Sequence, residues 1–182
     1  MSDEFKTPPV ESPPVESLDD DTDDSITVNG ITVPIKVARK SELLKTMIDS
    51  SIGHDNLQIN VENICLNKIL KWLALLVEGQ PTSIPTPLPN NNLGSVLTAW
   101  EQDYLDSLNQ DSPYHEMLCN ILTAANYMDI PSLVKLCSAK VASMLAGKSP
   151  EEIRSTFNIE NDFTPEEEAA TRAVNEDLGN YN

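Results

Sequence analysis

The stretch GKSPEEIRSTFNIENDFTPEEE, from Gly147 to Glu168, contains nearly the same four-residue phrase twice. SPEE at 149–152 fits a helix start, because the serine hydroxyl can accept from the backbone N–H three residues on while the glutamate reaches back to the serine N–H. Proline at the first helical position loses no hydrogen bond, since that N–H has no partner within a helix. TPEE at 164–167 repeats the pattern. The stretch therefore predicts two short helices, about 150 to 156 and 165 to 177.

Three large apolar residues, Phe157, Ile159 and Phe163, lie between the two predicted helix starts. Two short helices bury little by themselves, so these side chains either fold back on the preceding helix or form an interface with a partner. A partner entering here would meet an apolar groove rimmed by acids. Such a groove suits a helical ligand with basic flanks.

A small sheet is expected at the other end of the chain. Asn29-Gly30 separates two β-branched runs in SITVNGITVPIKV, residues 25–37. Both central residues of a type I′ turn need positive φ, so this pair predicts a two-residue hairpin. Pro34 cannot donate to a strand ladder and should lie at an edge or a bulge. LQINV, residues 57–61, predicts a further short strand.

Helical spacing accounts for most of the remaining sequence. A helix is expected from Ser41, which can cap it. The segment 61–79 predicts a helix that is apolar nearly all round and therefore deeply buried. Residues 80–95, with four prolines and three consecutive asparagines, predict a flexible loop inside the domain. The expected apolar positions of the first two helices are Leu43, Leu44, Met47 and Ile48, then Ile64, Cys65, Ile69, Trp72, Leu73 and Leu76; further helices are expected over 98–108, 112–130 and 131–148.

Acidity is concentrated at the two ends of this 182-residue chain, whose net charge is −17 at pH 7. Residues 1–24 hold nine acids and one lysine, and residues 149–182 hold nine acids and two arginines. The first of these segments is predicted to be a disordered acidic extension, since it has too little apolar surface to offset its ordering entropy. A chain this acidic is not expected to bind nucleic acid or an anionic membrane.

The sequence offers no catalytic or metal-binding constellation. Its two histidines, His54 and His115, have no plausible cysteine or serine partner nearby, and its six glycines form no phosphate-binding loop. Its three cysteines are not spaced as a metal pair, which favours a reducing cytosolic or nuclear compartment. A signal-peptide pattern and a long apolar span are both absent from the sequence. We therefore expect no enzyme, no cofactor, no metal and no small-molecule substrate.

Several of these segments resemble the S-phase kinase-associated protein 1 family, whose members are adaptor subunits of SCF (cullin–F-box) ubiquitin ligases. GKSPEEIRSTFNIENDFTPEEEA resembles the family's C-terminal signature, and LTAANYMDIPSL at 122–133 resembles its LAANYLDI segment. SELLKTMID resembles the second-helix motif, VENICLNKILKW the buried third helix, and WEQDY at 100–104 the family's WDQEF. The resemblance runs from about Val28 to Asn175.

The chain also departs from the family pattern. Asp177 stands where the family has a tryptophan near its C-terminus, and Cys119 stands where it has a phenylalanine. A tryptophan is a typical interface anchor, and losing one can cost about 2 kcal/mol. Together with the acidic extension, these differences indicate a diverged paralogue.

The resemblance implies an α/β (α+β) structure of BTB/POZ type, a small β-sheet flanked by helices, with two added C-terminal helices. It implies a BTB/POZ-like domain over 25–130, which includes the loop 80–95. A dimerisation-type helical extension would follow over 131–182, with the F-box interaction region at 124–182.

The resemblance implies a non-catalytic adaptor that bridges the N-terminal domain of a cullin and F-box substrate receptors, in the cytoplasm and nucleus. The cullin-binding residues carried over are Leu44, Met47, Ile48, Asn126 and Tyr127. The F-box-binding residues carried over are Leu122, Leu133, Leu136, Val141, Met144, Ile153, Phe157, Ile159, Phe163 and Leu178. Periodicity alone also allows Met47, Ile48 and about half of the F-box set to be core residues.

An alternative function follows from the missing tryptophan. The chain could be a structural or scaffolding protein of the same fold, which self-associates or binds an F-box protein outside a ligase. A strict monomer that binds a cullin would argue against this alternative.

Overall fold

The computed structural model describes residues 24–50, 56–80, 82, 84–88, 92–108 and 114–179. The predicted disordered extension lies outside the described residues, apart from Asp24. His54 and parts of the loop 80–95 lie outside them as well.

The sheet forms as the hairpin pattern predicts. Strands β1 (Ser25–Val28) and β2 (Ile31–Pro34) are antiparallel, and β3 (Asn56–Leu57) runs parallel to β1, giving the order β2-β1-β3. Asn29 and Gly30 both have positive φ, 48° and 83°, as the two-residue turn requires. Pro34 lies on the edge strand β2, where its missing N–H costs no ladder bond.

The side chain of Asn29 also determines where β3 ends. Its amide nitrogen donates to the carbonyls of Ile59 at 2.9 Å and Val61 at 3.0 Å, and its amide oxygen accepts from Ile59 N–H at 2.8 Å. The backbone of Ile59 therefore bonds to a side chain rather than to a strand. For this reason the strand predicted over 57–61 is wrong beyond Leu57.

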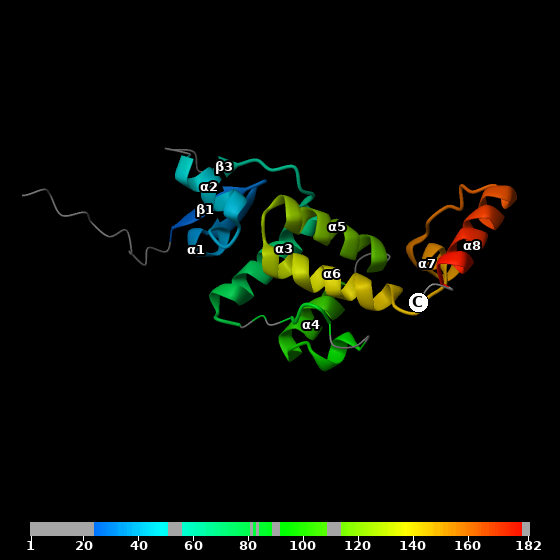
Figure 1. The fold of residues 1–182 in the computed structure, drawn as a ribbon. Coiled ribbons are helices and arrows are strands. Elements are labelled where there is room, and N and C mark those ends of the chain that lie inside the picture. Colours follow the sequence, from blue (N-terminus) through cyan, green and yellow to red (C-terminus); the bar gives the residue numbers. More distant parts are fainter. Residues whose placement is uncertain are drawn as a thin grey trace, which may run out of the picture.

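Helices make up most of the described chain (Figure 1). They are α1 (Ile35–Ala38), α2 (Glu42–Ser50), α3 (Asn63–Val77), α4 (Ala99–Ser107), α5 (Tyr114–Tyr127), α6 (Pro131–Leu145), α7 (Pro150–Phe157) and α8 (Pro165–Gly179), with a 3₁₀ turn η1 (Leu93–Ser95). The sheet, α1 and α2 lie at one end of the molecule, α3, α5 and α6 form its middle, and α7 and α8 lie at the far end. The described residues thus have a mixed α/β fold, with the two C-terminal helices that the sequence predicts. None of their helices has both the length and the apolar character needed to cross a bilayer.

The core is centred on α3, α5 and α6. Trp72 of α3 is fully buried, its ring lies 4.7 Å from that of Trp100 and 4.9 Å from that of Tyr104, and its indole N–H donates to Ser132 Oγ at 3.2 Å. One apolar position predicted for α3 is wrong, because Ile64 is 58% exposed. At 100° per residue, Ile64 lies about opposite the buried face of this helix.

The segment 80–95 is not a plain loop where the structure describes it. Leu93, in η1, is buried, and Ile84 and Leu88 pack against the core. These three apolar side chains anchor the segment, and η1 contacts α6. The composition of the segment predicted a flexible loop and did not indicate these anchors.

Both C-terminal helices begin as predicted. Ser149 Oγ accepts from Glu152 N–H at 3.2 Å while Ser149 N–H donates to the Glu152 carboxylate at 2.8 Å. Thr164 and Glu167 make the same reciprocal pair, at 3.3 and 2.9 Å. Each proline occupies the first helical position, and α7 stops at Asn158, which has a φ of 52°.

Candidate interaction surfaces

Of the three apolar residues in the stretch 147–168, Phe157 folds back and the other two do not. The ring of Phe157 lies edge-on to that of His115 in α5, with 5.5 Å between ring centroids, and is half-buried. Ile159 and Phe163 are 54% and 47% exposed. Phe157 therefore joins α7 to α5, and Ile159 and Phe163 form an exposed apolar surface, which we call the C-terminal surface.

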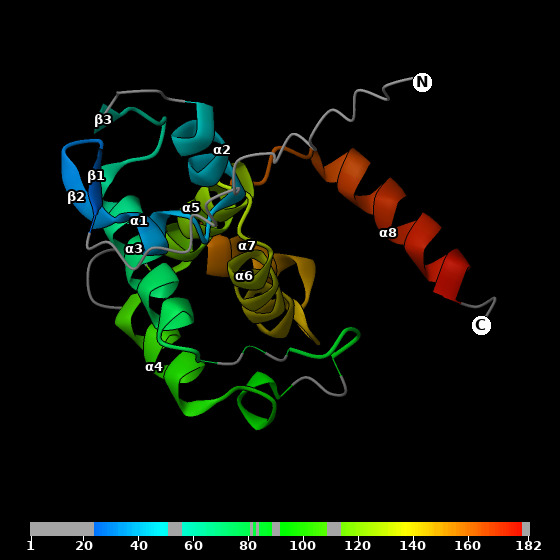
Figure 2. The ribbon, with the colours of Figure 1, turned by 90° about the vertical axis from the view of Figure 1, so that its left-hand side faces the viewer.

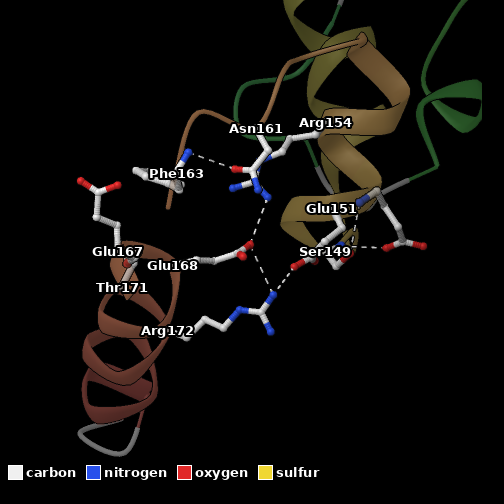
Figure 3. Close-up of polar contacts among 10 residues, drawn as sticks. Ser149, Glu151, Arg154, Asn161, Phe163, Glu167, Glu168, Thr171 and Arg172 are labelled. Carbon is white, nitrogen blue, oxygen red and sulfur yellow. Dashed lines mark hydrogen bonds and ion pairs between the residues drawn. The ribbon is translucent and has the colours of Figure 1, made fainter. Parts of the chain in front are cut away.

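Ion pairs join α7 to α8 (Figure 3). Arg172 of α8 lies 2.6 Å from the Glu151 carboxylate of α7, and Glu168 lies 3.5 Å from both Arg172 and Arg154. The Arg154 guanidinium also lies 5.8 Å from the centroid of the Phe163 ring, which is within cation–π range. These contacts place charged groups beside the exposed Phe163.

Two carboxyl groups at the starts of these helices have lowered pKa values. Hydrogen bonds from its own backbone N–H and from Ser149, helped by the positive charge of Arg172, hold the pKa of Glu151 below its ordinary value. Hydrogen bonds from the backbone and the hydroxyl of Thr164 lower the pKa of Glu167. Both glutamates are therefore ionised at neutral pH, when they stabilise the starts of α7 and α8.

Two residues carried over to the F-box side are core residues. Leu133 and Leu136 of α6 are fully buried against α5, so their assignment to a surface is corrected. Helical spacing marks the apolar face of α6 but does not distinguish the residues that its neighbours cover. Of the remaining residues, Leu122, Val141, Met144, Ile153 and Phe157 are half-buried, while the side chain of Leu178 lies outside the described residues.

A groove beside α6 was not predicted. It has a volume of about 550 Å³ and is lined by Ile84 and Leu88 of the anchored segment and by α6 residues that include Val134, Ser138 and Ala142. The last three recur every four residues, so they form one row along the helix. The four-residue spacing of this row is the sequence signal that could have indicated the groove. The signal is weak, because small side chains contribute little to an apolar pattern.

Residues carried over to the cullin side lie where α2 meets the end of α5. Ser41 Oγ donates to the Met128 carbonyl at 2.6 Å and accepts from Leu44 N–H at 3.2 Å. This buried serine fixes the start of α2 against the end of α5. Leu44 is fully buried there, so its assignment to a binding surface is corrected.

The accessible residues of this region form what we call the α2–α5 surface. Tyr127 is 48% exposed and Asn126 is exposed, while Met47 and Ile48 are half-buried. A shallow groove of about 340 Å³ runs beside the tyrosine; it is lined by Asn60, Val61, Glu62, Cys65, Asn120, Thr123, Ala124 and Tyr127. Asn120 and Thr123 were not predicted, although they precede Tyr127 by seven and four residues on the same helical face.

Among the described residues, no group of three or more histidine, cysteine or acidic side chains could hold a metal ion. Cys65, Cys119 and Cys137 are free thiols. Burial, with a smaller contribution from Cys119, raises the pKa of Cys137 to about 12, so this thiol is not a nucleophile at neutral pH.

Comparison with known proteins gives the chain its family. A family model described as "Skp1 family, dimerisation domain" matches residues 131–178. The S-phase kinase-associated protein 1 homolog of Tetrahymena thermophila is 42% identical, over 80% of this chain and 85% of that protein. The chain belongs to the Skp1 family.

Other relatives in the Skp1 family are named as subunits of a larger complex. The E3 ubiquitin ligase complex SCF subunit sconC of Arthroderma otae is 37% identical, over 80% of this chain and 86% of that protein. The subunit of the same name from Talaromyces marneffei is 38% identical, over 80% and 88%. The residues that match the Skp1-family model are those that form α6, α7 and nearly all of α8.

Proposed function

We propose that this chain is a non-catalytic adaptor of an SCF (cullin–F-box) E3 ubiquitin ligase, which bridges a cullin and F-box substrate receptors. Membership of the Skp1 family supports the proposal, as do relatives named as SCF subunits. Such an adaptor contributes by positioning, since it raises the effective concentration of a substrate near the ligase.

One observation about the fold carries the bridging role: the two candidate surfaces lie at opposite ends of α5. His115 near its start contacts Phe157 of α7, and Tyr127 is its last residue. Twelve residues of α-helix separate them, which is about 18 Å. Figure 1 shows α7 and α2 beyond the two ends of this helix. Two partners could therefore bind without competing for the same side chains.

The C-terminal surface is the proposed F-box side. Ile159 and Phe163 provide exposed apolar area, and Val141, Met144, Ile153 and Leu122 provide half-buried area on the neighbouring helices. The acids that begin α7 and α8 rim this area, which suits an amphipathic partner helix with basic flanks.

The α2–α5 surface is the proposed cullin side. Tyr127 is a suitable anchor, because a tyrosine ring can bury much apolar area against a partner while its hydroxyl forms a hydrogen bond. Asn126 lies beside it in the chain, and Met47 and Ile48 add apolar area on α2.

The test is a binding assay of the full chain with the N-terminal half of a cullin and, separately, with an F-box protein. The double variant N126K/Y127K should weaken cullin binding about 30-fold or more, since an anchor residue contributes at least about 2 kcal/mol. It should leave F-box binding unchanged. I159E/F163E should show the opposite pattern. Asn67→Lys, an exposed change on α3, is the control for an introduced lysine. The proposal is wrong if the unmodified chain binds neither the cullin nor the F-box protein.

A second candidate function is a self-associating structural protein of the same fold. The family model is described as a dimerisation domain, and Val174 of α8 adds to the exposed apolar residues in the matched region. Light scattering on the purified chain separates the two functions. A strict monomer that binds a cullin excludes this candidate, whereas a stable dimer that binds no cullin favours it.

We also propose that the chain acts in the cytoplasm and nucleus. Three free cysteines are consistent with these reducing compartments. Imaging of the tagged chain in cells, with fractionation as a second readout, tests this. Enrichment in a secretory compartment would contradict it.

A further inference from the structure

Basic side chains are concentrated in one short segment of this acidic chain. Four of its twelve lysines and arginines, Lys36, Arg39, Lys40 and Lys45, fall within ten residues that contain a single acid, Glu42. Lys36, Arg39 and Lys40 are exposed. We call these four residues the α1–α2 basic surface.

The fold places three of these charges on one side of a helical turn. Hydrogen bonds from Arg39 N–H to the Ile35 carbonyl at 2.9 Å and from Lys40 N–H to the Val37 carbonyl at 3.1 Å continue the turn of α1. Lys36 precedes Arg39 by three residues and Lys40 by four, which is the spacing of neighbours on a helix surface.

Acidic side chains of the described residues form ion pairs with only two of these four basic residues. Arg39 pairs with Asp49 at 2.7 Å and Lys45 with Glu42 at 3.1 Å. In the described residues, Lys36 and Lys40 have no ion-pair partner. Two exposed ammonium groups therefore remain for another anion.

The acidic extension enters the fold at this place. The Asp24 carbonyl accepts from Ile35 N–H at 2.9 Å, so the chain arrives one residue away from Lys36. Immediately before Asp24 lies LDDDTD, residues 18–23, with four aspartates. Asp19 is five residues from Asp24, so it can reach about 17 Å. Lys40 lies only about 6 Å along the helix from Lys36.

We propose that the segment 18–23 docks on the α1–α2 basic surface of its own chain. Single exposed ion pairs contribute about 1 kcal/mol or less. Tethering at Asp24 makes up for this weakness, since an attached segment has an effective concentration on the order of millimolar. A separate acidic molecule lacks that advantage and is repelled by a net charge of −17.

The experiment is NMR of the full ¹⁵N-labelled chain at about 20 and about 500 mM NaCl, a range over which screening shortens from beyond 20 Å to below 5 Å. Amide signals of Lys36, Arg39 and Lys40 should move with salt. The variant D19N/D20N/D21N/D23N should show the high-salt positions at both concentrations. D3N/E4Q/E11Q/E16Q is the matched control, since it removes four charges from the same extension at a greater distance, and it should leave the salt response intact.

A variant of the lysines tests whether the aspartates act on the basic surface by direct contact rather than through the connecting backbone. K36Q/K40Q should shift the signals of residues 19–23, and adding it to the aspartate variant should cause no further change in those signals. The proposal is overturned by signals that ignore salt, by additive shifts, or by an equal response in the matched control. The assay contains neither a cullin nor an F-box protein, so its outcome is independent of the proposed adaptor function.

Discussion

At the scale of single residues, Asn29 has two roles, one through its backbone conformation and one through its side chain. Its positive φ allows the hairpin turn, and its amide fixes the segment 59–61 through three hydrogen bonds. The turn role is local and was predicted from Asn-Gly. The second role joins residues about thirty positions apart, and no local pattern indicates it.

Replacing Asn29 with alanine should lower the free energy of unfolding by about 2–4 kcal/mol. Three hydrogen bonds at about 1 kcal/mol each are lost, and alanine tolerates positive φ less well. Urea unfolding followed by circular dichroism measures the change. Asn29→Gly is the control, because it keeps the backbone conformation and loses only the hydrogen bonds. It should therefore be less destabilising than alanine, and an alanine variant as stable as the parent would contradict the account.

At the scale of elements, the helix starts were the most predictable features. The capping pairs at Ser149 and Thr164 need only a pattern four residues long, and the structure confirms both. Burial was less predictable, because it depends on distant neighbours. Leu44, Leu133 and Leu136 were assigned to surfaces and are core residues, while Ile64 was expected in the core and is exposed. Periodicity identifies an apolar face but not what covers each position.

Ser149→Ala should destabilise the first turn of α7 by about 1 kcal/mol, the usual cost of losing a capping side chain. Amide hydrogen exchange of residues 151–154 should then be about fivefold faster, while exchange in α3 stays unchanged. Ser155→Ala, an exposed change inside α7, is the matched control and should slow exchange or leave it unaltered. Equal exchange in both variants would contradict the capping role.

The pH dependence of α7 and α8 follows from Glu151 and Glu167. Their pKa values are lowered in the folded chain, so their contribution to stability is present above the ordinary glutamate pKa of about 4.3 and is lost as pH falls through the lower folded values. NMR should show fraying of the starts of both helices below about pH 4 and none between pH 7 and 5. Glu151→Gln should show part of this fraying at neutral pH. Loss of order between pH 7 and 5 would contradict this origin.

At the scale of the whole molecule, α5 determines the arrangement. It packs on α3 and α6 in the core, contacts α7 near its start and meets α2 at its end. Figure 2 shows α8 extending away from these packed helices, and the ion pairs Arg154–Glu168 and Arg172–Glu151 join it to α7. The fold class was predictable from motifs along the chain. The separation of the two surfaces was not, because it depends on which end of α5 each neighbour meets.

Under the proposed function, one copy of this chain binds a cullin and an F-box protein at the same time through separate surfaces. The most direct test mixes the purified full chain with the N-terminal half of a cullin and an F-box protein, and measures the mass of the complex by size-exclusion chromatography with light scattering. We expect a single complex with one copy of each, in which N126K/Y127K releases only the cullin and I159E/F163E releases only the F-box protein. Mutually exclusive binding, or loss of both partners from either variant while the chain stays folded, would contradict it.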